Sequence, residues 1–220
     1  MTETLHATDR SRLRRMHDLG SFDVATINAI LDAQPLCTVA YVRDGKPYLT
    51  PTLQWRDGNR VYWHGSSASH ALRAGKGHDV CLNVTILDGF VLARSGFNHS
   101  VNTRSVTLFG SAELVPEDEK AAQLTAMIEG LWPGRSPLLR PMLPQEVKAT
   151  TILSLPITEG SAKIRSGPPA DEPEDYDLPI WAGVVPASLT LGPPLPDPQN
   201  KEGVAMPDHA KGIARFGTGS

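Results

Sequence analysis

The chain has 220 residues, of which 40% are hydrophobic and 20% are charged, and its net charge is −3. This length suffices for one domain with a substantial core, or for one domain with an extended tail. The charge provides no basic face for nucleic acid and no polybasic patch for an anionic membrane. No apolar run approaches the roughly 20 residues of a membrane-spanning helix.

The first twenty residues are polar and aperiodic, so a flexible N-terminal segment is expected over 1–20. Basic residues occur there without an apolar stretch behind them, which does not fit a secretory signal. The two cysteines, Cys37 and Cys81, lie in strand-like runs without metal-binding spacing. This pattern favours reduced, buried thiols in a cytoplasmic protein.

A helix is expected over 22–33, because apolar residues recur there at helical spacing. Ser21 is the expected N-cap residue of this helix. A short helix is expected around 68–74, after a Gly-Ser loop. Another is expected from Ala121 to about Gly130, behind an acidic stretch that favours a helix start.

Between the helices the pattern changes to alternating apolar residues and short turns, which is typical of antiparallel strands. Six strands are expected, over residues 36–42, 47–55, 60–64, 79–87, 105–115 and 149–157. Gly110, inside the fifth strand, indicates a bulge or a bend at a barrel corner. The sequence therefore predicts a mainly β domain over 21–166, arranged as a closed or nearly closed antiparallel barrel with flanking helices.

From residue 167 onward the composition shifts to clustered prolines, which disfavour regular packed structure. One apolar island, PIWAGVVP at 179–186, interrupts this tail. We expect 167–220 to form an extended Pro-rich arm whose island docks on the domain or on a second subunit.

Familiar catalytic motifs are absent from the sequence: it contains no GxGxxG, no GxxxxGK[ST], no HExxH and no GxSxG. The histidines lack the paired spacing of a structural zinc site, so no metal site is predicted. His99 and Ser100 are neighbours in sequence, which on a strand or loop separates their side chains rather than pairing them. Catalysis by protein groups alone is therefore not favoured.

A serine-rich loop, HGSSASH at 64–70, links the end of a strand to the start of a helix. A helix N-terminus offers unpaired N–H groups and a partial positive charge, and nearby hydroxyls and imidazoles add donors, so the loop suits a phosphate. The alternative is that Ser67 or Ser69 only caps the helix.

Two further features fit a bound cofactor. The polar side chains of Thr50 and Thr52 lie on one face of a strand that Pro51 makes irregular, where a planar ligand could accept hydrogen bonds. Arg94 and Arg104 flank HSVN, and guanidinium groups match phosphate bidentately. The alternatives are an ordinary solvated strand face and two surface or ion-paired arginines.

Together these features resemble the pyridoxamine 5′-phosphate oxidase-like superfamily of FMN-binding split barrels, in the branch that includes the nitroimidazole-resistance proteins. The resemblance is carried by VYWHGSSASHALRA at 61–74, DGFVLARSGFNHSVNTRSVTLFGSAEL at 88–114 and PIWAGVVP at 179–186. It implies a six-stranded antiparallel split β-barrel over roughly 20–165. It also implies a homodimer with FMN, or FAD in its place, bound at the subunit interface.

The resemblance also implies which residues hold the flavin. Thr50, Pro51 and Thr52 look like the strand that meets the isoalloxazine ring, and Trp181 could cover that ring from the arm. The neighbouring strand end and the phosphate loop correspond to Tyr62, Trp63, His64, Ser66, Ser67, Ser69 and His70. The Asn-x-Arg-Ser stretch, with Asn102, Arg104 and Ser105, would line the flavin site or brace the loop beside it.

The function favoured by this resemblance is a flavin-dependent oxidoreductase that acts on a small molecule, with nitro reduction as one candidate reaction. The cofactor carries the chemistry in such enzymes, so no protein nucleophile is needed. The alternatives are a flavin carrier or sensor without turnover, and a structural dimer that has lost its cofactor. Related barrels hold a deazaflavin or haem, and a haem would need an axial ligand such as His64 or His99.

Overall fold

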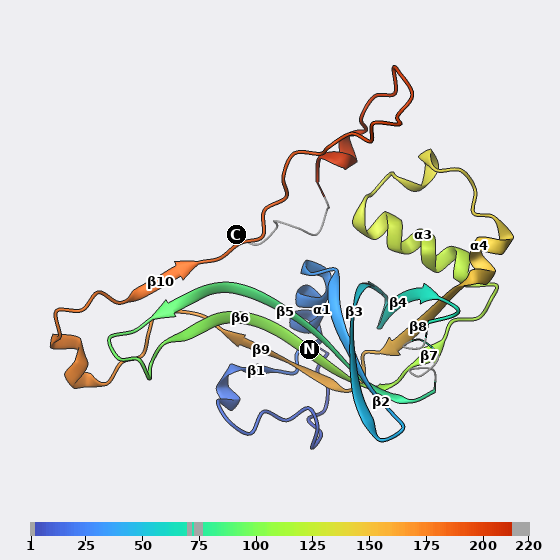
Figure 1. The fold of residues 1–220 in the computed structure, drawn as a ribbon. Coiled ribbons are helices and arrows are strands. Elements are labelled where there is room, and N and C mark those ends of the chain that lie inside the picture. The colour runs from blue at the N-terminus through green and yellow to red at the C-terminus, as the bar shows by residue number, and fades with distance from the viewer. Residues whose placement is uncertain (1–2, 70–71, 73–76, 213–220) are drawn as a thin grey trace.

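The computed structural model describes residues 3–69, 72 and 77–212. They form a mainly β fold built on one antiparallel sheet of ten strands with few helices (Figure 1), which confirms the predicted fold class. Along the sheet the order is β1, β9, β6, β5, β2, β3, β4, β8 and β7, and β10 pairs with β5 beside this path. The sheet has ten strands, so the expected count of six is not confirmed. Its path does not close on itself, and the arrangement is consistent with a split barrel.

The strands of this sheet range from two to fourteen residues in length. The first five are β1 (Gly20–Ser21), β2 (Leu36–Arg43), β3 (Lys46–Asp57), β4 (Arg60–Ser66) and β5 (Asp79–Leu92). The second five are β6 (Ser100–Ser111), β7 (Glu113–Leu114), β8 (Thr150–Pro156), β9 (Gly160–Arg165) and β10 (Gly183–Pro186).

Three α-helices lie within the described residues: α1 (Val24–Ala33), α3 (Lys120–Leu131) and α4 (Pro144–Ala149). The expected N-cap at Ser21 is wrong. Ser21 belongs to β1 and pairs with Ala162, whereas the Asp23 carboxylate accepts the Thr26 N–H at 2.8 Å and caps α1. Most of the helix expected around 68–74 lies outside the described residues. No described helix has the length and apolar character needed to cross a membrane.

Short 3-10 turns complete the secondary structure of the described residues. They are η1 (His17–Leu19), η2 (Ser136–Leu138), η3 (Pro173–Asp177) and η4 (Asp208–Lys211).

The core lies between α1 and the concave side of the sheet. Its centre consists of alternate residues from neighbouring strands, among them Leu82 and Val84 of β5 and Val106 and Leu108 of β6, all fully buried. Leu82 pairs with Leu108, and Val84 with Val106. Burial of such apolar pairs on one face is the main stabilising contribution to a sheet of this kind.

Strand β5 is longer than its predicted span of 79–87, because the Asp88-Gly89 pair forms a β-bulge instead of ending the strand. Leu87 pairs with Thr103 and Gly89 pairs with Asn102, so Asp88 is the extra residue. One extra residue reverses the alternation of the strand. Residues 80, 82 and 84 face the core before the bulge, whereas Val91 is buried and Phe90 is exposed after it.

The bulge is held by an ion pair. Arg104 donates from Nε and Nη2 to the two carboxylate oxygens of Asp88, at 2.9 and 2.8 Å. The Asp88 backbone carbonyl accepts the N–H of Ala187, at the end of β10, at 3.0 Å. Asp88 therefore joins β5, β6 and the C-terminal arm.

The arm begins with a buried contact to the β5–β6 hairpin. Arg94 donates to Asp171 at 3.0 Å, the Asp171 side chain is fully buried, and the Arg94 guanidinium lies 4.8 Å from the Tyr176 ring centre. Further along, β10 adds to the β5 edge of the extension that β5 and β6 form beyond the rest of the sheet (Figure 1). The apolar island thus pairs with β5 of its own chain through β10. The domain boundary between residues 166 and 167 remains a prediction.

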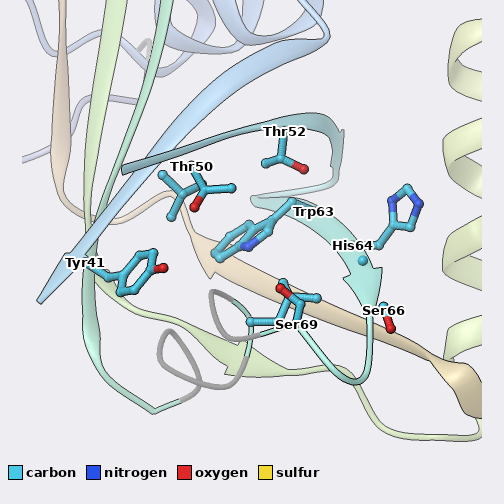
Figure 2. Close-up of a pocket in the computed structure, with 10 residues that line it drawn as sticks. Tyr41, Thr50, Thr52, Trp63, His64, Ser66 and Ser69 are labelled. Carbon is cyan, nitrogen blue, oxygen red and sulfur yellow. The ribbon is translucent and has the colours of Figure 1, made fainter. Parts of the chain in front are cut away.

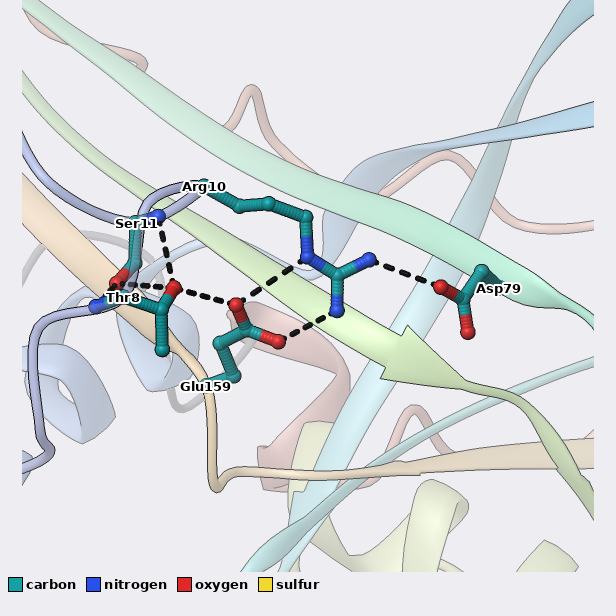
Figure 3. A network of polar contacts seen from close by, with 5 residues as sticks. All are labelled: Thr8, Arg10, Ser11, Asp79 and Glu159. Carbon is teal, nitrogen blue, oxygen red and sulfur yellow. Dashed lines mark hydrogen bonds and ion pairs between the residues drawn. The ribbon is translucent and has the colours of Figure 1, made fainter.

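The N-terminal segment contacts the sheet through a polar network (Figure 3). The Thr8 hydroxyl and the Arg10 guanidinium both donate to Glu159, and Arg10 also donates to Asp79 at 2.9 Å. The hydrogen bonds from Arg10 first, and then from Thr8, lower the pKa of Glu159 below its ordinary value of 4.5. The network ties this segment to the end of the sheet at which β5 and β9 begin. The expected flexibility of the segment stays a prediction.

Replacement of Glu159 by Gln should lower the free energy of unfolding at pH 7 and have a smaller effect in acid. The folded-state pKa of Glu159 is lowered, so its stabilising contribution is present above the ordinary value of 4.5 and is lost as the pH falls through the folded value. Denaturant titrations of the parent, Glu159→Gln and the exposed control Glu202→Gln at pH 7 and pH 3.5 measure this. An equal loss at both pH values would contradict the assignment.

The bulge ion pair should be detectable in a double-mutant cycle of Arg104→Met and Asp88→Asn. Both side chains are about one-third exposed, so the coupling energy should be about 1 kcal/mol or less, but above zero. The highly exposed Lys211–Asp208 pair is the matched control and should show no measurable coupling. Additive effects of the Arg104 and Asp88 changes would show that the pair does not hold the bulge.

Candidate functional site

A small cavity lies where β2, β3 and β4 meet the loop after β4 (Figure 2). Its volume is about 100 Å³. Six of the predicted site residues line it, namely Thr50, Thr52, Trp63, His64, Ser66 and Ser69. The other lining residues are Val39, Tyr41, Gly65 and Leu72.

Antiparallel pairing explains how the two threonines reach the cavity. Thr50 and Thr52 alternate along β3 and therefore project on the same face. Thr50 pairs with Val39, and Tyr48 pairs with Tyr41, so the apolar wall from β2 shares that face. The rings of Tyr41 and Tyr48 stack with centroids 5.5 Å apart. Val39 and Tyr41 could have been found only from this register, because their apolar pattern alone is typical of any core strand.

Trp63 forms the inner wall of the cavity. It is 3% exposed and pairs with Gln54 across the β3–β4 hairpin. Gln54 itself is fully buried, and its Nε2 donates to the carbonyls of Leu31 and Gln34 at 2.6 and 2.7 Å. Gln54 therefore joins the end of α1 to β3 and is not part of the polar surface that a ligand could reach.

Two of the predicted residues on these strands point elsewhere. Tyr62 is next to Trp63 on β4 and so faces the opposite side, where it stacks on Trp55 with centroids 5.7 Å apart. Pro51 lies between the two threonines and is exposed. Neither residue lines the cavity.

The backbone amides of the serine loop are already hydrogen-bonded at three positions. Ser67 N–H donates to the Ala149 carbonyl at 2.8 Å, Ala68 N–H to the Ser66 hydroxyl at 3.2 Å, and Ser69 N–H to the Ser66 carbonyl at 2.8 Å. The expected free amides are therefore occupied at these positions, which leaves side-chain hydroxyls as the donors. Ser66 and Ser69 line the cavity, Ser67 is exposed outside it, and His70 lies outside the described residues.

His64 is half-buried at the edge of the cavity, and Figure 2 shows its ring directed away from Trp63. The imidazole lies at a tilt to Trp55, with centroids 5.9 Å apart. Its Nδ1 atom is buried and makes no hydrogen bond with the described residues. Burial lowers the pKa of His64 below its ordinary value of 6.5, so the ring is neutral at pH 7.

The remaining predicted residues do not line this cavity. Buried Asn102 donates to the Gly167 carbonyl at 3.0 Å, Arg104 pairs with Asp88, and the Ser105 hydroxyl donates to the Lys163 carbonyl at 3.4 Å. Trp181 is 70% exposed on the arm before β10. These contacts agree with the alternative interpretation of Arg104, and that of Arg94, as ion-paired arginines.

Within the described residues, no cluster of three or more His, Cys, Asp or Glu side chains could hold a metal ion. The cavity combines hydroxyl donors, an apolar floor and a neutral imidazole. Such a surface suits an uncharged planar ring with hydrogen-bonding edges, and a volume near 100 Å³ is below the roughly 300–1,000 Å³ of a complete ligand pocket. The cavity is therefore not by itself a complete ligand pocket.

Comparison with known proteins assigns a family to this fold. The family model for pyridoxamine 5′-phosphate oxidase matches residues 23–164. The flavocytochrome Anf3 from Azotobacter vinelandii is 48% identical, with a TM-score of 0.90, over 92% of this chain and 95% of its own. An FAD- and haem-binding protein from Mycobacterium smegmatis is 38% identical, with a TM-score of 0.86, over 90% of this chain and 100% of its own.

A more distant structure shares the fold alone. A candidate 5-nitroimidazole antibiotic resistance protein from Bacteroides thetaiotaomicron is 18% identical, with a TM-score of 0.52, over 64% of this chain and 84% of its own. No curated protein sequence matches the chain. The resemblance to the pyridoxamine 5′-phosphate oxidase-like flavin-binding proteins, drawn from the sequence, is thus confirmed.

The lowered pKa of His64 should be visible in a proton NMR titration of the folded protein. The His64 ring should titrate below 6.5, because burial disfavours the imidazolium. With a folded-state pKa below the unfolded value, the unfolded chain binds more protons, so the associated stability should fall as the pH drops below about 6.5. The resonance is assigned by its loss in His64→Gln. A midpoint above 6.5 would show that the ring is not buried as described.

Proposed function

This chain belongs to the pyridoxamine 5′-phosphate oxidase family, and we propose that it binds a flavin together with a haem and acts as a small redox protein. The observation that carries the proposal is the 48% identity to a flavocytochrome over 92% of the chain. The second relative, 38% identical over 90% of the chain, binds FAD and haem. The flavin supplies one- or two-electron transfer when bound, and the haem one-electron transfer.

The flavin is proposed to lie at the cavity between β3, β4 and the serine loop. The hydroxyls of Thr50 and Thr52 project from one strand face toward it, and Ser66 and Ser69 stand at its other end. The buried indole of Trp63 gives an apolar wall. This set fits a ring system with polar edges and a phosphate-bearing chain, held by neutral donors.

FAD is the proposed flavin, in preference to FMN. The support is the relative that binds FAD and haem. The occupied amides of Ser67, Ala68 and Ser69 also point this way, because the loop offers hydroxyls at these described positions in place of free N–H groups for a terminal phosphate dianion. FMN is the alternative, and titration with each flavin distinguishes the two.

A second copy of the chain is proposed to complete the site. The cavity of one chain is too small to enclose a flavin. Leu36 and Leu49, on the opposite face of β2 and β3 from the cavity threonines, are each about 60% exposed. Exposed apolar side chains on a sheet face suit coverage by a partner. This supports the homodimer with interface cofactor sites that the family resemblance implied.

The reaction is proposed as oxidation or reduction of a small molecule. The alternative is a carrier or sensor that holds its cofactors without turnover; its mark would be bound flavin that neither NADH nor NADPH reduces. Nitro reduction has no separate support, because the nitroimidazole-resistance relative is 18% identical and shares the fold alone.

Flavin binding and its placement can be tested by quenching of flavin fluorescence. The protein should bind FAD more tightly than FMN. Thr52→Val and Ser66→Ala should each weaken FAD binding about fivefold, the equivalent of the ~1 kcal/mol of one hydrogen bond. Ser105→Ala is the matched control, because its hydroxyl bonds to Lys163 outside the cavity.

Two results would contradict this part of the proposal. Failure of the parent protein to quench either flavin would refute flavin binding altogether. If Thr52→Val and Ser66→Ala bind FAD as tightly as the parent, and Ser105→Ala binds it more weakly, the flavin site would lie on the face of β6 that carries Ser105.

A further inference from the structure

The extension formed by β5, β6 and β10 carries an unusual outer face. Val185 of β10 pairs with Phe90 of β5, and Phe90 pairs with Val101 of β6. Residues that are directly paired in a sheet project on the same side. The three side chains therefore form one row across three strands, and they are 47%, 51% and 41% exposed.

Trp181 extends this row. A Cβ atom on Gly183 would lie 2.9 Å from the Trp181 ring. The ring therefore packs on Gly183, on the side to which a side chain at that position would project. Gly183 and Val185 alternate along β10, which places the indole on the same side as Val185. Trp181 is 70% exposed, so it presents an open aromatic surface on the same side of the sheet as Phe90. We call the surface of Trp181, Val185, Phe90 and Val101 the outer apolar face.

His99 lies at the end of this face, two residues before Val101. Its Nδ1 is 2.8 Å from the Ser95 carbonyl oxygen. A carbonyl only accepts, so the proton of the neutral ring is on Nδ1 and the lone pair is on Nε2. The side chain is exposed, and this anchoring by a backbone carbonyl is the arrangement that orients metal-ligating histidines.

His64 is less suited to ligate a metal. Its buried Nδ1 has no acceptor among the described residues, so coordination through Nε2 would leave a buried N–H without a partner. Figure 2 shows the His64 ring at the edge of the cavity between β3 and β4. The two sites therefore differ in chemistry: hydroxyls surround the cavity, whereas the outer face is apolar with one oriented imidazole.

We propose that the outer apolar face binds the haem and that Nε2 of His99 is an axial ligand of its iron. A porphyrin is planar and mostly apolar, which matches an exposed row that includes an indole and a phenyl ring. Iron in haem proteins commonly takes a neutral imidazole as axial ligand. The proposal rests on the proposed function, and it separates the haem site from the flavin cavity.

The test uses the full chain loaded with haemin and read by optical and electron paramagnetic resonance spectra. The parent should show histidine-ligated haem. His99→Gly should lose these bands, and added imidazole should restore them by filling the space left by the side chain. His78→Gly, which removes an exposed histidine beside the other end of β5, is the matched control and should keep the parent spectrum.

A second variant tests the face independently of ligation. Phe90→Ala should weaken haemin binding about tenfold by removal of apolar contact area, while the bands of the bound form stay those of histidine ligation. FAD binding should be unchanged in both His99→Gly and Phe90→Ala.

The outcomes separate the two claims. Absence of ligated haem in the parent protein would refute haem binding in the proposed function. Ligated haem in the parent, with the same spectrum in His99→Gly, would overturn the assignment of His99. If His64→Gln loses the spectrum of histidine-ligated haem and His99→Gly keeps it, the ligand would be His64, and the assignment of His99 would be overturned.

Discussion

The Asp88–Arg104 ion pair spans the bulge in β5 on which the two faces of the β5–β6 ladder depend. Asp88 is the extra residue of a bulge in β5, and Arg104 fixes its carboxylate with two hydrogen bonds from the adjacent strand. Before the bulge, alternate residues of β5 fill the core; after it, the alternation reverses and Phe90 faces outward. The same strand thereby builds the body of the sheet and an exposed apolar surface beyond it.

The two proposed cofactor sites use different parts of this framework. The cavity belongs to the body of the sheet, where β3 and β4 are adjacent in sequence and bring Thr50, Thr52 and the serine loop together. The outer apolar face belongs to the extension and needs the arm, because β10 supplies Val185 and positions Trp181. The carbonyl of Asp88 also accepts from Ala187, so the bulge and the arm support each other.

Local pattern predicted a helix over 22–33, found as α1 (Val24–Ala33), and most strands, because these depend on neighbours in sequence and on simple alternation. Six of the residues that the family resemblance assigned to the flavin line the cavity. Local pattern ended β5 at 87, because Asp-Gly usually marks a turn, whereas here it forms a bulge. Strand β9 was missed because Gly160–Arg165 alternates weakly and is defined by its pairing to β6. The places of Arg104 and Trp181 likewise follow from long-range pairing, which residue type alone does not reveal.

The central claim is that one chain holds a flavin and a haem at separate sites. Native mass spectrometry of the protein, reconstituted with FAD and haemin and freed of excess ligand, tests it most directly. The account predicts a species that carries one FAD and one haem per chain, with neither displacing the other. A protein that binds only one of the two at a time, or neither, would contradict it.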